Sequence, residues 1–232
     1  MTGGGPVFQP LPALEGRSLV QRVERELLRA IVEGRIELGE RIVEAEYARQ
    51  LGISRAPLRE AARLLEQRGL LIARPNRGFF VRRYTAGELD DLYGLRICLE
   101  RYAVTEATSR ASVAELGGLA SQLARMTDAA VRGDRFAIVE EDIGFHRLLC
   151  DMSGNTRLRR TFEDLAVDLA ILISRLADLD VDPRIVVESH TEFLTAILAR
   201  DGVRATEAID DHIRGAWTEM RQSAGILSTV PA

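Results

Sequence analysis

The sequence lacks lysine altogether, and all 31 of its basic residues are arginine. We attribute this uniform choice to a coding bias, so it carries no functional conclusion. Cysteine is also rare: Cys98 and Cys150 lie in apolar, helical contexts and form no metal-binding or redox motif. We therefore expect two buried free thiols rather than a disulfide framework.

Long hydrophobic runs are absent as well. No apolar stretch reaches the roughly 18 to 20 residues that a membrane-spanning helix needs. The N-terminal residues lack the basic-then-apolar pattern of a signal peptide, so we expect a flexible arm and a cytoplasmic protein that binds no membrane. The 232 residues, 46% of them hydrophobic and 28% charged, are enough for two modest domains.

The net charge of −4 conceals an uneven distribution along the chain. Residues 1–84 contain 15 Arg and 10 Asp or Glu, a balance of +5. Residues 85–232 contain 16 Arg and 25 Asp or Glu, a balance of −9. A basic segment followed by an acidic remainder indicates a polyanion-binding module joined to a part with another task.

The segment 51–65 has the pattern of a helix that fits the DNA major groove. Ser54 is a favourable N-cap residue, because its hydroxyl can accept a hydrogen bond from the first helical turn. Arg55, Arg59 and Arg63 recur every four residues on one face. Another face is apolar and consists of Leu58, Ala61, Ala62 and Leu65. An arginine row alone is more often a solvated surface, so the DNA interpretation depends on the neighbouring segments.

Those neighbouring segments complete a winged helix. Residues 44–51 predict a short helix before the arginine-bearing one, which makes a helix-turn-helix. Residues 70–72 and 79–81 predict two strands, and the intervening Arg74-Pro75-Asn76-Arg77-Gly78 has turn chemistry. Arg77 and Gly78 then lie at the tip of a wing, where they could contact phosphates or a minor groove.

The stretch LGISRAPLREAARLLEQRGLL followed by RPNRGFFV resembles the DNA-binding domain of the GntR family of bacterial transcription regulators. The resemblance implies operator contacts by Arg55 and Arg59 and by the wing tip. The family often has an arginine where this chain has Ala45, and Arg49 is the nearby substitute. No operator sequence can therefore be transferred. The expected DNA-binding residues are Ser54, Arg55, Arg59, Arg49, Arg77 and Gly78.

The remainder of the chain is helical by pattern. Its breakers include Gly133-Asp134, Ser153-Gly154-Asn155 and Asp201-Gly202, and Asn155 is a predicted N-cap. No strand-like alternation is present. We expect six helices in an all-α bundle, at about residues 86–109, 112–132, 135–152, 156–177, 183–200 and 203–224.

All three histidines lie in this predicted bundle, on three different helices. Asp142 is four residues before His146, so the two side chains share a helical face. His190 and His212 have apolar flanks, which is compatible with an interior location. Three imidazoles and a carboxylate are suitable ligands for a divalent transition metal. Taken singly, each histidine is more often an ordinary core or surface residue.

The segment from Leu92 to Glu100, with Asp142-x-x-Phe145-His146, Ser153 to Leu158, His190 and His212, resembles the FCD-type effector domain of the FadR branch of that family. The six helices resemble its VanR-like subgroup. The resemblance implies that Asp142, His146, His190 and His212 bind Zn²⁺, Ni²⁺ or a similar ion. It also implies that Arg96 pairs with the carboxylate of a small organic acid. Without the resemblance, Arg96 and Glu100 could form a plain i,i+4 surface pair.

The sequence thus predicts a mainly α protein with an N-terminal winged helix-turn-helix and a C-terminal bundle. The expected parts are an arm (1–17), a DNA-binding domain (18–82), a linker (83–87), a helical ligand-binding domain (88–224) and a tail (225–232). We expect a homodimeric transcription regulator, most often a repressor in this family, whose affinity for operator DNA responds to a small carboxylate. A metal-free sensor, a sensor of the metal itself and a metalloenzyme are the alternatives, although no catalytic motif supports the last.

Overall fold

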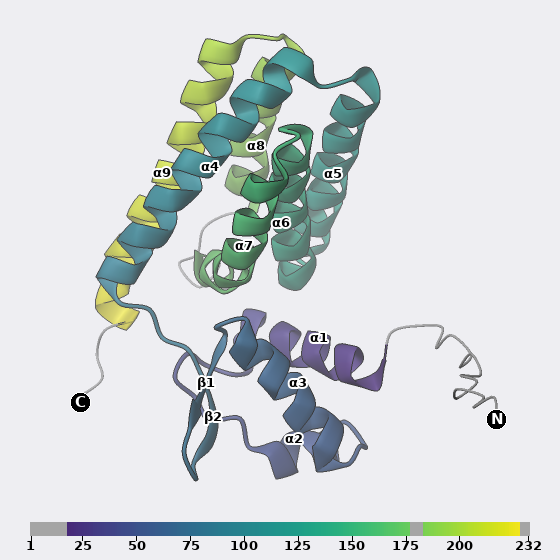
Figure 1. The fold of residues 1–232 in the computed structure, drawn as a ribbon, viewed down its shortest axis with the longest axis vertical. Helices are drawn as coiled ribbons and strands as arrows, with labels where there is room; N and C mark the ends of the chain where they lie inside the picture. The colour runs from purple at the N-terminus through teal and green to yellow at the C-terminus, as the bar shows by residue number, and fades with distance from the viewer. Residues whose placement is uncertain (1–17, 177–182, 228–232) are drawn as a thin grey trace, which may run out of the picture.

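The computed structural model describes residues 18–176 and 183–227, which form an N-terminal domain with a wing and a helical bundle (Figure 1). The predicted arm, residues 1–17, lies outside the described residues. Of the predicted tail, residues 225–227 continue the last helix, and the others lie outside the described part. Among the helices described, none is long and apolar enough to cross a membrane.

The N-terminal domain packs three helices beside a hairpin. Its elements are α1 (Leu19–Val32), α2 (Glu44–Gln50), α3 (Arg55–Gln67), β1 (Leu71–Arg74) and β2 (Gly78–Val81). The face of α3 that the sequence predicted to be apolar is the buried one: Leu58, Ala61, Ala62 and Leu65. Burial of one leucine side chain stabilises the fold by about 1.5 to 3 kcal/mol. The apolar pattern of α3 therefore fixes which of its faces turns outward.

The turns of this domain follow from residues that tolerate positive φ. Gly69 ends α3 with a φ of 81°, and Asn76 and Gly78 in the hairpin turn have φ of 59° and 85°. Ser54 occupies the N-cap position of α3, but its side chain makes no capping hydrogen bond. The predicted capping bond of Ser54 is therefore wrong. The residue is exposed, so water can satisfy the first-turn amides instead.

The described part of the C-terminal domain consists of six helices, which confirms the predicted all-α bundle. They are α4 (Ala86–Arg110), α5 (Val113–Arg132), α6 (Arg135–Met152), α7 (Thr156–Leu176), α8 (Pro183–Leu198) and α9 (Gly202–Leu227). Thr85 and Glu88 form a capping box at the start of α4. Asn155 Oδ1 accepts hydrogen bonds from the amides of Arg157 and Leu158, as predicted for an N-cap. Figure 1 shows α4 and α9 running side by side.

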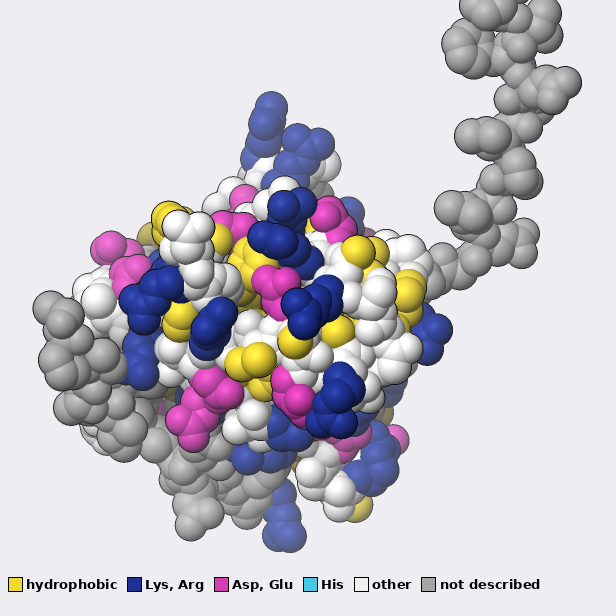
Figure 2. Space-filling view, turned by 90° about the horizontal axis from the view of Figure 1, so that it is seen from below, with side chains coloured by type: hydrophobic (Ala, Val, Ile, Leu, Met, Phe, Trp, Pro, Cys, Tyr) yellow, Lys and Arg dark blue, Asp and Glu magenta, His cyan; other side chains and the backbone are white. Residues whose placement is uncertain are grey.

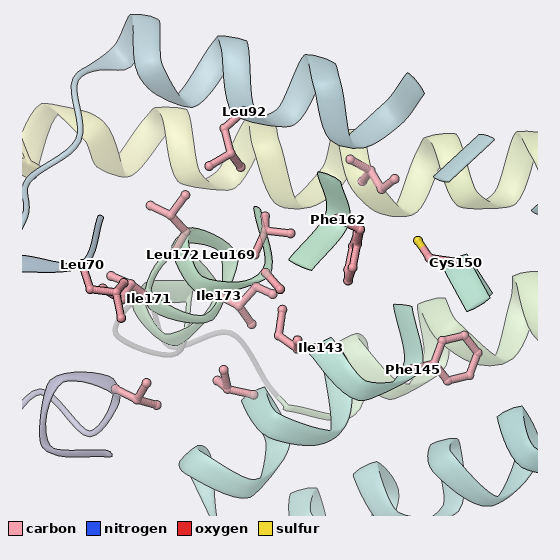
Figure 3. Packing of buried hydrophobic residues seen from close by; sticks show 14 of the residues in the cluster. Leu70, Leu92, Ile143, Phe145, Cys150, Phe162, Leu169, Ile171, Leu172 and Ile173 are labelled. Atoms are coloured by element: carbon pink, nitrogen blue, oxygen red, sulfur yellow. The ribbon is translucent and has the colours of Figure 1, made fainter. Parts of the chain in front are cut away.

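Helix α7 contributes several side chains to the core of the bundle. Figure 3 shows Leu169, Leu172 and Ile173 of α7 among apolar side chains that include Leu92 of α4 and Ile143 of α6. Leu70, which precedes β1, belongs to the same continuous cluster of buried residues. The hydrophobic core therefore continues from the bundle into the N-terminal domain.

Polar contacts also join the two domains. Arg25 of α1 forms an ion pair with Glu140 of α6 at 2.6 Å. Tyr84, in the segment between β2 and α4, donates a hydrogen bond of 2.7 Å to Asp168 Oδ1 of α7. Arg82 bridges Asp168 and Glu88. The linker is thus held against the bundle by side chains of both domains.

The two cysteines differ in their surroundings. Cys150 is buried, as predicted, and burial raises the pKa of its thiol. Cys98 is exposed, so its predicted burial is wrong. Helix α4 buries the face that carries Ile97 and Glu100, and Cys98 lies on its other side.

Candidate functional site

Four polar side chains converge inside the bundle. Asp142 and His146 come from α6, His190 from α8 and His212 from α9. Each offers one ligand atom, and these atoms all lie within 4.8 Å of one another. Asp142, His146 and His190 are buried, and the residue His212 is partly exposed although its ring lies among the other three side chains. The structure therefore brings together all four residues that the sequence predicted as metal ligands.

Backbone and serine acceptors orient two of the imidazoles. His190 Nδ1 lies 2.6 Å from the carbonyl oxygen of Val186, which can only accept, so this nitrogen carries the proton. The Ser189 hydroxyl donates to the same carbonyl, so its oxygen accepts from His212 Nδ1 at 3.0 Å. When such a ring is neutral, its Nε2 atom keeps an unprotonated lone pair.

His146 is oriented by two charged residues of α4. Its Nδ1 lies 2.6 Å from Glu100 Oε2, although the contact is not well aligned for a hydrogen bond. Arg96 Nη2 lies 2.9 Å from His146 Nε2, and a guanidinium can only donate, so Nε2 is the acceptor. Arg96 Nε also donates to Glu100 Oε1 at 2.7 Å. The i,i+4 pair of Arg96 and Glu100 does form, but both residues are buried, so the surface-pair interpretation is wrong.

The electrostatics favour neutral imidazoles at His146 and His212 beside charged carboxylates. Burial lowers the pKa of His146, and it lowers the pKa of His212 well below the usual value. Burial alone would raise the pKa of Asp142, but the hydrogen bond and charge of His190 outweigh it and lower this pKa to about 2. Burial is likewise outweighed at Glu100, where the Arg96 charge lowers the pKa to about 2. His146, His212 and Asp142 therefore present acceptors to the centre of the cluster.

This donor set fits a divalent transition metal. His190 Nε2 lies 3.1 Å from His146 Nε2 and 3.1 Å from Asp142 Oδ1, so polar atoms of these three residues face one another. Asp142 Oδ2 is buried and has no hydrogen-bond partner among the described residues. Metal-binding histidines usually donate their other ring N–H to a carboxylate, a carbonyl or a hydroxyl; His190 and His212 do so, and His146 Nδ1 faces Glu100. A cation at the centre would satisfy the facing lone pairs.

A cavity of about 290 Å³ adjoins the cluster. Its polar lining includes both arginines and carboxylates: Arg96, Arg135, Asp142, Ser174, Ser189, Glu192, Asp211, His212 and Glu219. Most of the remaining wall is apolar and comprises Ile138, Val139, Ile173, Ile185, Val186, Ala208 and Ala216. The cavity can therefore hold a small molecule with a polar group at one end and an apolar body.

A second site lies on the N-terminal domain, between the start of α3 and the wing. Figure 2 views this domain from the side away from the bundle and shows arginines, the only basic residues of the chain, spread across the surface. A groove of about 600 Å³ is lined by Arg55 and Arg59 of α3 and by Gly78 of the wing. Arg55 and Arg59 are exposed and have no ion pair or side-chain hydrogen bond with any described residue. Both guanidinium groups are therefore available to an anionic partner.

The other predicted DNA-binding residues lie outside this groove. Ser54 is exposed at the N-cap of α3, and Arg49 forms an exposed ion pair with Glu46 at 2.7 Å. Arg77 lies over the Phe80 ring of the wing. Sequence reasoning missed Arg41 and Arg74, which line the groove. The position of Arg74 beside the hairpin turn was a signal for it; Arg41 reaches the groove only through its bridge to Phe80 in the folded protein.

Comparison with known protein families identifies both domains. Residues 19–81 match the model of the bacterial regulatory proteins of the gntR family, and residues 91–215 match the FCD domain. The chain belongs to the GntR family of bacterial regulatory proteins. Its FCD domain contains the four converging ligand residues and Arg96, and its GntR domain contains the arginine-lined groove.

Individual relatives agree with this assignment. YdhC of Bacillus subtilis, an uncharacterized HTH-type transcriptional regulator, is 39% identical over 139 residues, which cover 60% of this chain and 62% of YdhC. The aligned part thus spans less than two thirds of that relative. A probable D-xylose utilization operon transcriptional repressor of Paenarthrobacter nicotinovorans is 29% identical over 84% of this chain and 86% of its own length. The structure of McbR/YncC of E. coli, 25% identical, superposes with a TM-score of 0.74 and covers 90% of this chain and 99% of that one.

Proposed function

We propose that this GntR-family protein is a DNA-binding transcriptional regulator whose operator affinity depends on a small carboxylate bound at a metal site in the FCD domain. The DNA-reading part is supported by the exposed Arg55 and Arg59 at the start of α3 and by the groove between α3 and the wing. A helix that presents its N-terminal residues to the major groove can donate paired hydrogen bonds to guanine edges. A homodimer would read two half-sites of a near-palindrome.

The sensing part combines a metal with an arginine. Asp142, His146, His190 and His212 would hold Zn²⁺ or Ni²⁺, and Arg96 at the edge of the cavity would hold a carboxylate of the effector. When bound, the metal supplies a Lewis-acid anchor for an effector oxygen. The guanidinium offers a planar fork that matches a carboxylate. An apolar cavity wall beside these groups suits the body of a small organic acid.

One observation carries this proposal: three imidazoles and a carboxylate converge, and the outer nitrogen of each imidazole faces an acceptor. The test is a metal analysis of purified protein, before and after dialysis against Zn²⁺ or Ni²⁺. The wild-type chain should retain about one ion per chain, and a variant with His146→Ala and His190→Ala should retain none. Unchanged metal content in the double variant would refute the ligand set.

The same preparations decide between the alternatives. A titration of DNA affinity against metal, with and without an organic acid such as acetate, separates three outcomes. Dependence on the acid in the presence of metal supports the proposed sensor. Dependence on the metal alone indicates a metal sensor, and dependence on the acid after removal of the metal indicates a metal-free sensor.

A further inference from the structure

Arg96 donates a hydrogen bond to the nitrogen atom of His146 that a metal ion would need. Its Nη2 lies 2.9 Å from His146 Nε2, the nitrogen that faces Asp142 and the other two histidines. The opposite nitrogen of His146 faces Glu100, so Nε2 is the only one directed to the shared centre. A neutral imidazole nitrogen has a single lone pair. Arg96 and a metal therefore compete for the same electron pair.

Displacement of Arg96 has a consequence because the residue is buried. Its side chain is 1% exposed, so an N–H group that loses His146 cannot turn to bulk water. A buried guanidinium donor without an acceptor is costly, and the loss is greatest for a charged group. The displaced N–H must therefore find another acceptor close by.

The surroundings of Arg96 limit where that acceptor can be. Its Nε stays 2.7 Å from Glu100 Oε1, which anchors one edge of the guanidinium. The side chain also lines the cavity beside Asp142 and His212. A carboxylate entering this cavity offers two oxygen acceptors in the plane of the guanidinium. Metal binding thus leaves an Arg96 N–H group without an acceptor, and a carboxylate in the cavity can supply one.

We propose that Arg96 is an exchange element that couples the two ligands of the site. In the metal-free protein it donates to His146 Nε2; when the metal takes that nitrogen, Arg96 pivots on Glu100 and donates to the carboxylate of the effector. This inference rests on the proposed function and adds a regulation to it. Each ligand then raises the affinity for the other by the same factor, because coupling between binding sites is reciprocal.

Glu100 is a positioning residue in this arrangement. Its two oxygens face two different partners, Arg96 Nε at 2.7 Å and His146 Nδ1 at 2.6 Å. The same carboxylate thereby anchors the pivot and holds the proton of His146 away from the metal side. Replacement of such an outer partner typically lowers metal affinity by about 10- to 100-fold.

The first experiment measures Zn²⁺ affinity by calorimetry in the absence and presence of acetate. Acetate should raise the affinity of the wild-type chain at least about fivefold. Arg96→Gln removes the competitor, so Zn²⁺ alone should bind about tenfold more tightly, and acetate should add much less than in the wild type. Glu100→Gln should weaken Zn²⁺ binding and alter the visible spectrum of bound Co²⁺. Arg147→Gln is the matched control, because Arg147 pairs with Glu163 outside the site.

The second experiment uses metal-free protein in the presence of a chelator. His146→Leu releases Arg96, so this variant should bind acetate more tightly than the wild type. Arg147→Gln is again the matched control, because Arg147 follows His146 in α6 but pairs with Glu163 outside the site. This arm remains decisive if Arg96→Gln, which leaves Glu100 buried without its cation, fails to fold.

The outcomes separate this inference from the proposed function. If no variant and not even the wild type binds Zn²⁺, the metal site itself is refuted, and the exchange with it. If Zn²⁺ binds but Arg96→Gln binds it no more tightly and keeps the full acetate effect, only the exchange is refuted. Equal acetate affinity of metal-free wild type and His146→Leu also overturns the exchange.

Discussion

Replacement of Arg59 by alanine should greatly weaken sequence-specific DNA binding while the protein stays folded. Arg59 lies on the outer face of α3 and lines the groove toward the wing. It is exposed and has no ion-pair partner among the described residues, so its truncation leaves no buried group without a hydrogen bond. Surface substitutions of this kind usually change the free energy of unfolding by less than about 0.5 kcal/mol.

The expected loss of affinity follows from the number of base contacts. A bidentate contact between arginine and guanine contributes about 1 to 3 kcal/mol of discrimination. A dimer that reads two half-sites loses two such contacts, or about 2 to 6 kcal/mol. The dissociation constant for specific DNA should therefore rise at least about 30-fold. Binding to random DNA, which depends on phosphate contacts, should weaken much less.

The assay can start without a known operator. Rounds of selection from a random duplex library with the wild-type protein define a preferred site, and fluorescence anisotropy then measures binding to that site and to a random duplex. Arg63→Ala is the matched control, because Arg63 lies on the same arginine row but outside the groove and within 3.6 Å of Glu60. Its loss should be smaller and equal for both duplexes. Full specific affinity of Arg59→Ala would refute the assignment of α3 as the reading helix.

Three further predictions concern the stability and the coupling of the protein. Tyr84→Phe removes the hydrogen bond to Asp168, so the free energy of unfolding in urea should fall by about 1.5 kcal/mol, and the response of DNA affinity to Zn²⁺ with acetate should weaken. Leu58→Ala empties a fully buried position in the N-terminal domain and should lower that free energy by about 2 to 5 kcal/mol. For His146 and His212 the folded-state pKa lies below the usual 6.5, so the unfolded chain binds protons first as the pH falls. The unfolding free energy of the metal-free protein should therefore decrease below about pH 6.5, by at most about 1.4 kcal/mol per pH unit for each histidine.

Each of these predictions has an outcome that contradicts it. An unchanged ligand response in Tyr84→Phe would show that the linker contact does not carry the coupling. A small loss in Leu58→Ala would mean that the site collapses around the missing atoms. If His212→Gln leaves the pH dependence as steep as in the wild type, His212 does not contribute to it.

The winged helix could be predicted because its determinants are local. The apolar face of α3, the glycine after it and the turn residues of the wing each specify a conformation within a few residues. The same reasoning failed at Ser54 and Cys98. A capping residue can adopt the cap backbone without its side-chain hydrogen bond. An apolar helical context does not tell which face of a two-sided helix such as α4 turns outward.

The four candidate metal ligands could be proposed from the sequence, but the residues that orient them could not. Glu100 and His146 are far apart in the chain, and only the packing of α4 against α6 brings them together. The hydroxyl of Ser189 gains its role only in the fold, where it lies between Val186 and His212. Local periodicity contains no information about such contacts. The burial of Arg96, and hence its competition for His146, was likewise inaccessible from spacing alone.

Helix α4 connects the sensing site to the DNA-reading domain more directly than any other described element. Arg96 and Glu100 both lie on it, and only residues 82–85 separate its first residue from the end of β2 in the wing. A ligand can change DNA affinity only if it binds the two arrangements of the protein with different free energies. An exchange of the Arg96 partner changes the contacts between α4 and His146 of α6, so it acts on the position of α4 within the bundle. We therefore expect a shift of α4 to reach the wing through the linker, which the Tyr84–Asp168 hydrogen bond holds against α7. For this reason Tyr84→Phe should alter the response of DNA affinity to the ligands, although Tyr84 contacts neither of the proposed ligands.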